Sequence, residues 1–256
     1  MTTGRTSVSE LRPAALGVLG MVLIVAVWQA VAAAKLLGTA VAPPTAVIKV
    51  LATTAQRSQL VTAASQTGAE AVTGFAAGFV VATLAGLLVT AVRPLRRGVD
   101  QLATVESAIP FVALAPILLA LFSRAHLPAA MAATTAFFPL YIAIVSGMAA
   151  TPQAIVDVHT VLGASRLTTL VRARIPAGLP VVATGAKVGV PLAIVGAVIG
   201  EWFGASAGVG PVMLVAMRNY QMPMMWATMT VTVALALVLY GIAAMLEWVA
   251  VQRFSP

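Results

Sequence analysis

The sequence predicts an all-α integral membrane protein with about six transmembrane helices. Of its 256 residues, 61% are hydrophobic and only 9% are charged, and the mean hydropathy is +1.02. Soluble domains carry roughly 45–50% apolar and about 25% charged residues. The apolar residues also gather in runs of about 20, the length that an α-helix needs to cross the hydrocarbon core of a bilayer. These observations leave no room for a separate soluble domain.

Six runs are long enough to be transmembrane helices. In order they cover residues 14–34, 71–92, about 101–122, 127–150, 179–200 and 226–251. The first apolar core is about 21 residues long, which exceeds the 7–15 residues of a cleaved signal peptide. We therefore expect one transmembrane domain over residues 14–251, preceded by a cytoplasmic segment, 1–13, and followed by a cytoplasmic tail, 252–256.

Basic residues predict the orientation of the helices. With the N-terminus in the cytoplasm, the inside segments hold nine basic residues and the outside segments five. The inside set is Arg5, Arg12, Arg93, Arg96, Arg97, Arg166, Arg172, Arg174 and Arg253. Because cytoplasmic loops carry an excess of Lys and Arg, we expect a multi-pass protein of the cytoplasmic (inner) membrane with both termini inside.

Small residues in the second expected helix recur every four positions, at Gly74, Gly78, Ala82 and Gly86. This spacing lets helices approach closely. It is typical of bundle packing, and it also suits helices that line a moving pathway. Prolines at 110, 116, 139 and 191 are expected to interrupt helices at membrane depth, where protein or a water-filled cavity must satisfy the freed backbone groups.

The segment 151–178 is the longest and most basic inside loop. Pro152 suits the first turn of a helix, Gly163 interrupts the helical pattern, and Ser165 is suited to cap a second short helix. Two short helices that meet at a glycine outside the bilayer would form a protrusion. A protrusion of this kind suits a cytoplasmic partner, although a plain connecting loop is an equally good reading of the residues alone.

No sequence pattern in the chain predicts catalysis. It lacks a GxxxxGK[ST] phosphate-binding loop, an HExxH pair, a GxSxG elbow and any cysteine. The two histidines, His126 and His159, are far apart in the sequence, so we expect no metal site. If the chain moves a solute, the energy has to come from elsewhere, either from an ion gradient or from a separate ATPase.

The protrusion resembles the cytoplasmic loop of bacterial ABC importer permeases. In that family a Glu-Ala-Ala triplet precedes a glycine, and an Ile/Leu-Pro pair follows about a dozen residues later. Here Gly163, Ile175 and Pro176 match, and Asp157-Val158-His159 stand in place of the triplet. Further motifs in the same order resemble the permeases for nitrate, sulfonates, taurine, bicarbonate and thiamine-type precursors. They are APPTAV from Ala42, TGFAAGF from Thr73, IPFVALAP around Pro110, AFFP at 136–139, TGAKVG from Thr184 and GEWFGASAGVG from Gly200.

The resemblance implies the fold and function of a permease of the type I (MetI-like) ABC importers. The chain would form the translocation path for a small solute, either an anion of the nitrate, sulfonate, taurine or bicarbonate type or a vitamin precursor. It would itself be no enzyme: two separate ATPase subunits would bind ATP and Mg. A second permease subunit, identical or a sister chain, and an extracytoplasmic solute-binding protein would complete the transporter. We expect no nucleic-acid partner.

The resemblance also implies roles for particular residues. Coupling to the ATPase subunit is expected of Asp157, Val158, His159, Gly163, Ala164, Ser165, Arg166 and Pro176. The translocation path is expected to include Glu106, Pro110, Phe138, Lys187 and Glu201. Charged groups in apolar runs are costly and often mark such a path or a partnered pair. A lysine that faced the path would favour anionic cargo, and one that snorkels to the interface would not.

Three other classes of protein compete with this interpretation. A secondary transporter driven by an ion gradient would be expected to show internal repeats, and none is evident in the sequence. An intramembrane enzyme would need nucleophiles, bases or metal ligands at one depth. A secondary transporter would also have no obvious use for the protrusion. The third class is a structural membrane subunit with no transport role.

Overall fold

The computed structural model describes the backbone of residues 8–254 and the side chains of residues 16–92 and 94–254. The remainder of the predicted cytoplasmic ends, 1–7 and 255–256, lies outside the described residues. The described chain is helical, with five helices long and apolar enough to span a membrane and a sixth candidate formed by a bent pair. The prediction of an all-α membrane protein with about six spans is confirmed.

The helices group into two compact units. The first comprises Met1–Gln59 with Met213–Thr230, and the second comprises Leu60–Val212 with Val231–Pro256. Two long helices, α3 (Thr54–Ala91) and α11 (Met222–Phe254), contribute residues to both units.

The first unit contains α1 (Val8–Ala33) and α2 (Pro44–Ala52). Trp28 and Trp226 hold its connecting segment. The indole nitrogen of Trp28 donates to the carbonyl of Ala42 at 3.1 Å, and that of Trp226 donates to the carbonyl of Ala40 at 2.9 Å. The two rings lie 5.3 Å apart. The two hydrogen bonds thus tie both tryptophan side chains to the segment that follows α1.

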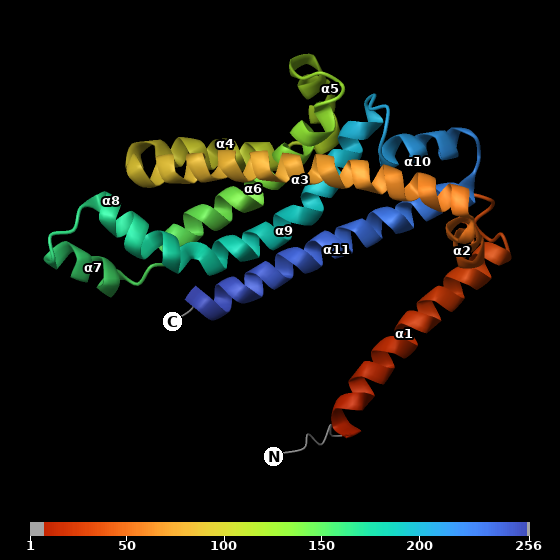
Figure 1. Cartoon of the computed structure of the whole chain (residues 1–256), viewed down its shortest axis with the longest axis horizontal. Helices are drawn as coiled ribbons and strands as arrows, with labels where there is room; N and C mark the ends of the chain where they lie inside the picture. Colours follow the sequence, from red (N-terminus) through yellow and green to blue (C-terminus); the bar gives the residue numbers. More distant parts are fainter. Residues whose placement is uncertain (1–7, 255–256) are drawn as a thin grey trace. The chain divides into compact units, whose positions relative to one another are not determined.

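The core of the second unit is formed by α6 (Leu127–Ala149) and α9 (Ile175–Trp202), which run side by side in Figure 1. Glycine makes this close approach possible. A Cβ at Gly147 would lie 2.8 Å from the carbonyl oxygen of Gly178, and one at Gly196 would lie 2.6 Å from the carbonyl oxygen of Met131. These are separations that real side chains do not tolerate, so the two backbones are in contact.

The same helix α6 packs against α3 on its other side. The predicted small-residue row is buried here: Gly74, Gly78, Ala82 and Gly86 all face inward. A Cβ at Gly78 would lie 2.6 Å from the carbonyl oxygen of Ala133. The four-residue spacing therefore serves helix packing, as expected of small residues between membrane helices.

The third expected helix is not one helix, and this prediction is wrong. After the short η1 (Arg93–Leu95), the chain forms α4 (Arg96–Ala108) and α5 (Phe111–Leu121), which are bent by 108° relative to each other. Pro110 explains the break. It forces Ile109 into an extended conformation, with φ −77° and ψ 128°, because proline excludes the helical conformation at the preceding residue.

The other prolines stay inside helices. Pro116 lies within α5, Pro139 within α6 and Pro191 within α9. They remove individual backbone hydrogen bonds, and neighbouring helices support the bundle around them. Of the four prolines expected to interrupt helices, only Pro110 ends one.

The predicted inside loop is largely helical. It contains α7 (Gln153–Val161), the short α8 (Arg166–Thr169) and a π-helical turn, η2 (Leu170–Arg174), which leads directly into α9. The fifth span thus begins before residue 179, and Pro176 lies in the first turn of α9. That position tolerates proline because the first-turn N–H groups need no intrahelical partner.

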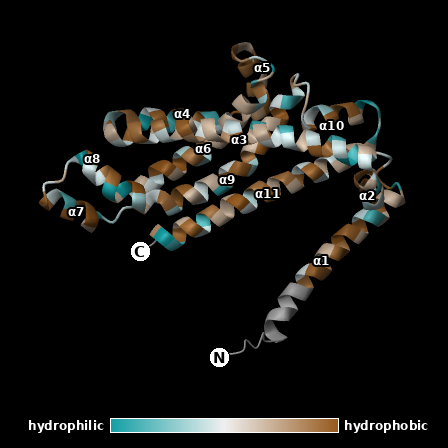
Figure 2. Ribbon diagram, viewed as in Figure 1, coloured by the Kyte–Doolittle hydropathy of each residue, from teal (hydrophilic) through white to brown (hydrophobic). Residues whose placement is uncertain are grey.

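Apolar side chains cover the outer surfaces of the long helices. Figure 2 shows hydrophobic residues spread over the visible faces of α9 and α11 instead of along one stripe. Residues on α11 such as Leu237 (64% exposed) and Val238 (61%) are uncovered in the single chain. A helix that is hydrophobic all round is typical of a membrane span.

The last short helix, α10 (Val209–Arg218), lies between α9 and α11 in the sequence.

Candidate functional site: a coupling hairpin and a candidate path

The helices α7 and α8 form a hairpin that projects beyond the ends of α6 and α9 in Figure 1. No residue of α7 is buried. The hairpin exposes apolar side chains, including Val158 (56%), Val161 (86%), Leu162 (78%) and Leu167 (69%). Exposed clusters of this kind are typical of surfaces that bind another protein.

The turn of the hairpin depends on Gly163. Its φ is +69°, a left-handed conformation that costs a residue with a side chain roughly 1–2 kcal/mol. Two backbone hydrogen bonds end α7 at this turn. The N–H of Gly163 donates to the carbonyl of Thr160 (3.0 Å), and the N–H of Ala164 donates to the carbonyl of His159 (2.9 Å). The sequence prediction of two short helices that meet at this glycine matches the structure.

Polar side chains fix both helices of the hairpin. As predicted, Ser165 caps α8: its Oγ accepts from the backbone N–H of Thr168 at 3.1 Å. In α7, Gln153 donates to Asp157 at 2.8 Å, and the His159 ring contacts the carbonyl of Ile155 at 2.9 Å. Arg166 is exposed, and Pro176 lies farther along, in α9. Seven of the eight expected coupling residues thus share the hairpin, and Pro176 does not.

The five expected path residues do not gather into one site. Among the described residues, no hydrogen bond or ion pair joins any two of Glu106, Pro110, Phe138, Lys187 and Glu201. Phe138 is partly buried and packs against the core of the second unit. Pro110 marks the α4–α5 break. Each of the three charged residues has different surroundings.

Lys187 is neutralised within the chain. Its ammonium pairs with the carboxylate of Glu247 on α11, and Thr184 Oγ1 donates to the other oxygen of Glu247 at 2.7 Å. The lysine side chain is 24% exposed and the glutamate 16%. Sequence reasoning missed Glu247, although it is an acidic residue in an apolar helix and the rule that selected Lys187 could have found it.

Glu201 is a buried anchor, with 1% of its surface exposed. Its carboxylate accepts from Thr67 Oγ1 on α3 at 2.5 Å and from the backbone N–H of Gly210 at 2.6 Å. Thr67 also accepts from the N–H of Val209 at 3.0 Å. The carboxylate therefore holds the first turn of α10, where the helix dipole favours negative charge, against α3.

Glu106 differs from both. It lies in the last turn of α4, next to the break, and both of its carboxylate oxygens are buried. Among the described residues, neither oxygen has a hydrogen-bond partner. An unsatisfied buried carboxylate is costly, so Glu106 is the expected path residue whose surroundings most clearly call for a partner outside the single chain.

Comparison with known proteins places the chain in a family. Residues 74–249 match the family described as the binding-protein-dependent transport system inner membrane component. A probable ABC transporter permease of Haemophilus influenzae is 33% identical over 168 residues, which cover 65% of this chain and 69% of the relative. The formylaminopyrimidine transport permease of Halalkalibacterium halodurans is 32% identical over 138 residues. The aligned part covers 54% of this chain and 55% of that permease.

Two further comparisons agree with this family. The riboflavin transport system permease of Chloroflexus aurantiacus is 28% identical over 61% of this chain and 59% of its own. This chain thus matches less than two thirds of the length of each of the two relatives that are named for a transported solute. Among solved structures, the inward-facing MetNI methionine ABC transporter is similar, with a TM-score of 0.69, 17% identity and coverage of 77% of this chain and 99% of that one. The chain belongs to the family of binding-protein-dependent transport system inner membrane components and is the permease subunit of an ABC importer.

Proposed function

We propose that the α7–α8 hairpin couples this permease to a separate ATPase subunit on the cytoplasmic side. The observation that carries the proposal is the hairpin itself, a protrusion with an exposed apolar face. It lies at the end of the bundle that carries Arg166, Arg172 and Arg174. Val158, Val161 and Leu162 supply the apolar contacts, and Asp157, His159 and Arg166 supply polar ones. Gly163, Ala164 and Ser165 hold the turn that fixes their relative positions.

The transporter would contain two permease chains around a central path, two ATPase subunits that bind ATP and Mg, and a solute-binding protein outside the membrane. The second permease is either another copy of this chain or a sister chain. The uncovered apolar surface of α11 provides room for such a neighbour. Both termini and the hairpin would lie in the cytoplasm, the orientation that the distribution of basic residues favours.

The hairpin would transmit ATP binding to the path. Closure of the two ATPase subunits would draw the two hairpins together, and the continuous helical segment from α8 through η2 to α9 would carry that displacement into the core of the bundle. ATP can bias the path only if the two states of the bundle contact the ATPase differently. Hydrolysis then returns the bundle to its first state.

The ion pair of Lys187 bears on the choice of solute. Because Glu247 neutralises this lysine, Lys187 offers an anion no net attraction. Two relatives are named for formylaminopyrimidine and riboflavin transport. We therefore favour a vitamin or vitamin precursor over a small anion of the nitrate, sulfonate, taurine or bicarbonate type. Competition of labelled riboflavin uptake by pyrimidine precursors, and separately by taurine and nitrate, tests this choice in cells that carry the complete transporter.

The coupling role is tested by Gly163→Val with Gly38→Val as its matched control. Both glycines have a φ of +69°, and no described atom lies within 4 Å of the site of an added Cβ at either. The backbone strain of the two variants is therefore equal, and only the location differs. We expect Gly163→Val to insert normally but to lose uptake and solute-stimulated ATP hydrolysis by about tenfold, as a strain of 1–2 kcal/mol at the contact allows. Gly38→Val should retain both activities, and equal behaviour of the two variants would refute the coupling role.

A further inference from the structure

A cavity of about 300 Å³ lies at the arginine-rich end of the second unit, outside the hairpin and the expected path. Its wall comes from the last turns of α3 and α6, the start of α4 and the π-helical turn. The lining residues are Val89, Thr90, Arg96, Val145, Met148, Ala149 and Arg174. The site thus combines an apolar wall with two guanidinium groups.

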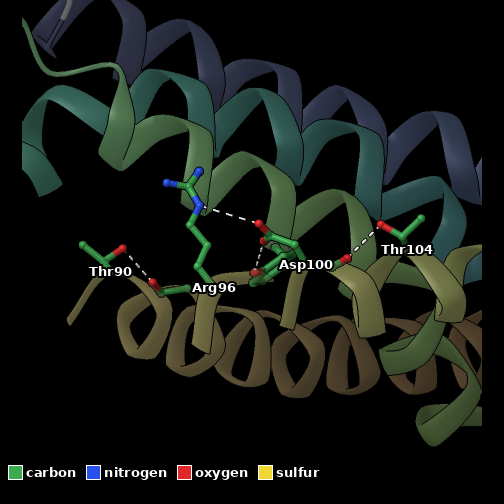
Figure 3. A network of polar contacts seen from close by, with 6 residues as sticks. Thr90, Arg96, Asp100 and Thr104 are labelled. Carbon is green, nitrogen blue, oxygen red and sulfur yellow. Dashed lines mark hydrogen bonds and ion pairs between the residues drawn. The ribbon is translucent and has the colours of Figure 1, made fainter. Parts of the chain in front are cut away.

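One of the two arginines is partly compensated. Figure 3 shows the guanidinium of Arg96 directed at Asp100, and the two groups are 3.6 Å apart. Asp100 also accepts a hydrogen bond from Tyr141 on α6, at 2.5 Å. The tyrosine holds the carboxylate against α6, and the carboxylate in turn contacts Arg96, which lines the cavity.

The other arginine has no such partner. Within the described residues, no carboxylate lies at ion-pair distance from Arg174, which is half-buried. Two guanidiniums and one carboxylate leave one net positive charge at the cavity. A half-buried guanidinium without a carboxylate partner favours an anion, and Arg forms its strongest hydrogen bonds with phosphate and carboxylate oxygens.

The π-helical turn η2 places Arg174 at the cavity. It spans Leu170–Arg174, and within it Arg172 is exposed while Arg174 lines the cavity. Single π-turns inside long helices are uncommon and occur frequently at functional sites. Pro176, two residues after Arg174, has no backbone N–H to donate, which is compatible with the interruption of regular α-helical hydrogen bonding at η2.

The depth of the cavity decides what kind of anion reaches it. It lies where α3 and α6 end, at residues 91 and 149, and therefore at the boundary between the apolar spans and their basic flanks. Phospholipid headgroups occupy this depth, and basic pockets between transmembrane helices bind their phosphates. The apolar part of the wall, including Val145 and Met148, suits the upper part of an acyl chain.

We propose that this cavity binds the phosphate of an anionic phospholipid through Arg174 and Arg96. A soluble phosphate compound has the same chemistry at its phosphate, but it lacks the chains that the apolar wall would contact. The site is separate from the coupling hairpin, so its occupancy would stabilise the bundle without being required for contact with the ATPase.

The test uses the purified full-length chain and three probes: phosphatidylglycerol, phosphatidylcholine with the same chains, and inorganic phosphate. Native mass spectrometry measures lipid occupancy, and thermal unfolding measures protection. We expect phosphatidylglycerol to bind more tightly than phosphatidylcholine. Arg174→Gln should weaken phosphatidylglycerol binding about tenfold, the usual effect of losing a hydrogen bond to a charged group. Arg172→Gln, the matched control from the same turn, should leave binding unchanged.

Three results would overturn the proposal. Equal binding of the two lipids would remove the role of headgroup charge, and equal weakening by Arg172→Gln and Arg174→Gln would show a diffuse surface attraction. Protection by inorganic phosphate without protection by phosphatidylglycerol would show that the anion is soluble. Should Arg174→Gln not fold, Arg174→Lys keeps the charge and loses the planar fork. We expect it to retain only part of the preference for phosphatidylglycerol, and full retention would contradict bidentate binding.

Discussion

At the scale of single residues, each of two glutamates in the membrane helices is satisfied by hydrogen-bond donors from another helix. Glu201 bridges α9, α3 and the start of α10, and Glu247 connects α11 to Lys187 and Thr184 on α9. Ionisable groups at membrane depth need such partners. These polar contacts hold together helices that otherwise pack mainly through small and apolar residues.

The anchor at Glu201 predicts a graded loss of stability. Replacement by Ala leaves Thr67 Oγ1 and the N–H of Gly210 without their acceptor in a buried site, which should lower the free energy of unfolding by about 1–3 kcal/mol. Replacement by Gln keeps one acceptor and should have a smaller effect. Thermal unfolding in detergent measures both, and an Ala variant as stable as the wild type would show that the anchor is dispensable.

The ion pair of Lys187 and Glu247 predicts compensation by a charge swap. Lys187→Glu and Glu247→Lys, each alone, place like charges opposite each other between α9 and α11 and should reduce the yield and melting temperature of the folded protein. The double variant restores opposite charges and should recover most of the loss. If the two single effects simply added in the double variant, the pair would not be interacting.

The residues of the hairpin could be predicted from the sequence more fully than those of the candidate path. Gly163 and Ser165 act through local backbone geometry, which sequence spacing reports directly. The partners of Lys187 and Glu201 are 60 and 134 positions away, and no local pattern specifies them. Asp100 and Tyr141 were missed for the same reason, since they are 41 positions apart.

At the scale of the helices, α6 is the central element because α3 and α9 both pack closely on it. The contacts depend on glycines that face backbone atoms of α6. The row in α3 could be read from its four-residue spacing. Pro110 was expected to interrupt the third span, but the division into two helices was missed because hydropathy gives no sign of the 108° change in direction.

The packing of α3 on α6 predicts a sharp difference between two glycines. Gly78→Leu would drive a side chain into the backbone of Ala133, whereas Gly241→Leu on α11 meets nothing within 4 Å among the described residues. Overpacking of this kind costs typically 1–3 kcal/mol, and more where backbone is struck. We expect the Gly78 variant to lose monodisperse protein in size-exclusion chromatography and the Gly241 variant to keep it. Similar elution profiles for both would argue against the observed α3–α6 contact.

At the scale of the whole molecule, the chain leaves much apolar surface uncovered and ends its bundle in an exposed hairpin. Both features are those of a subunit that functions within a larger assembly in a membrane. The family assignment rests on residues 74–249 and the fold on the likeness to the methionine transporter. Permeases of this family work with separate ATPase subunits. The proposal to be tested is that this chain contacts its ATPase through the α7–α8 hairpin.

The most direct measurement of that claim is site-specific cross-linking from the hairpin. The chain contains no cysteine, so Leu162→Cys and Leu37→Cys each introduce a single thiol at an exposed position. The wild-type residues at these positions are 78% and 63% exposed. A short thiol-directed cross-linker is applied to membranes that hold the complete transporter, and the adducts are identified by mass spectrometry. We predict an adduct with the ATPase subunit from position 162 and none from position 37. Failure of position 162 to reach the ATPase, in a transporter that still hydrolyses ATP and imports solute, would contradict it.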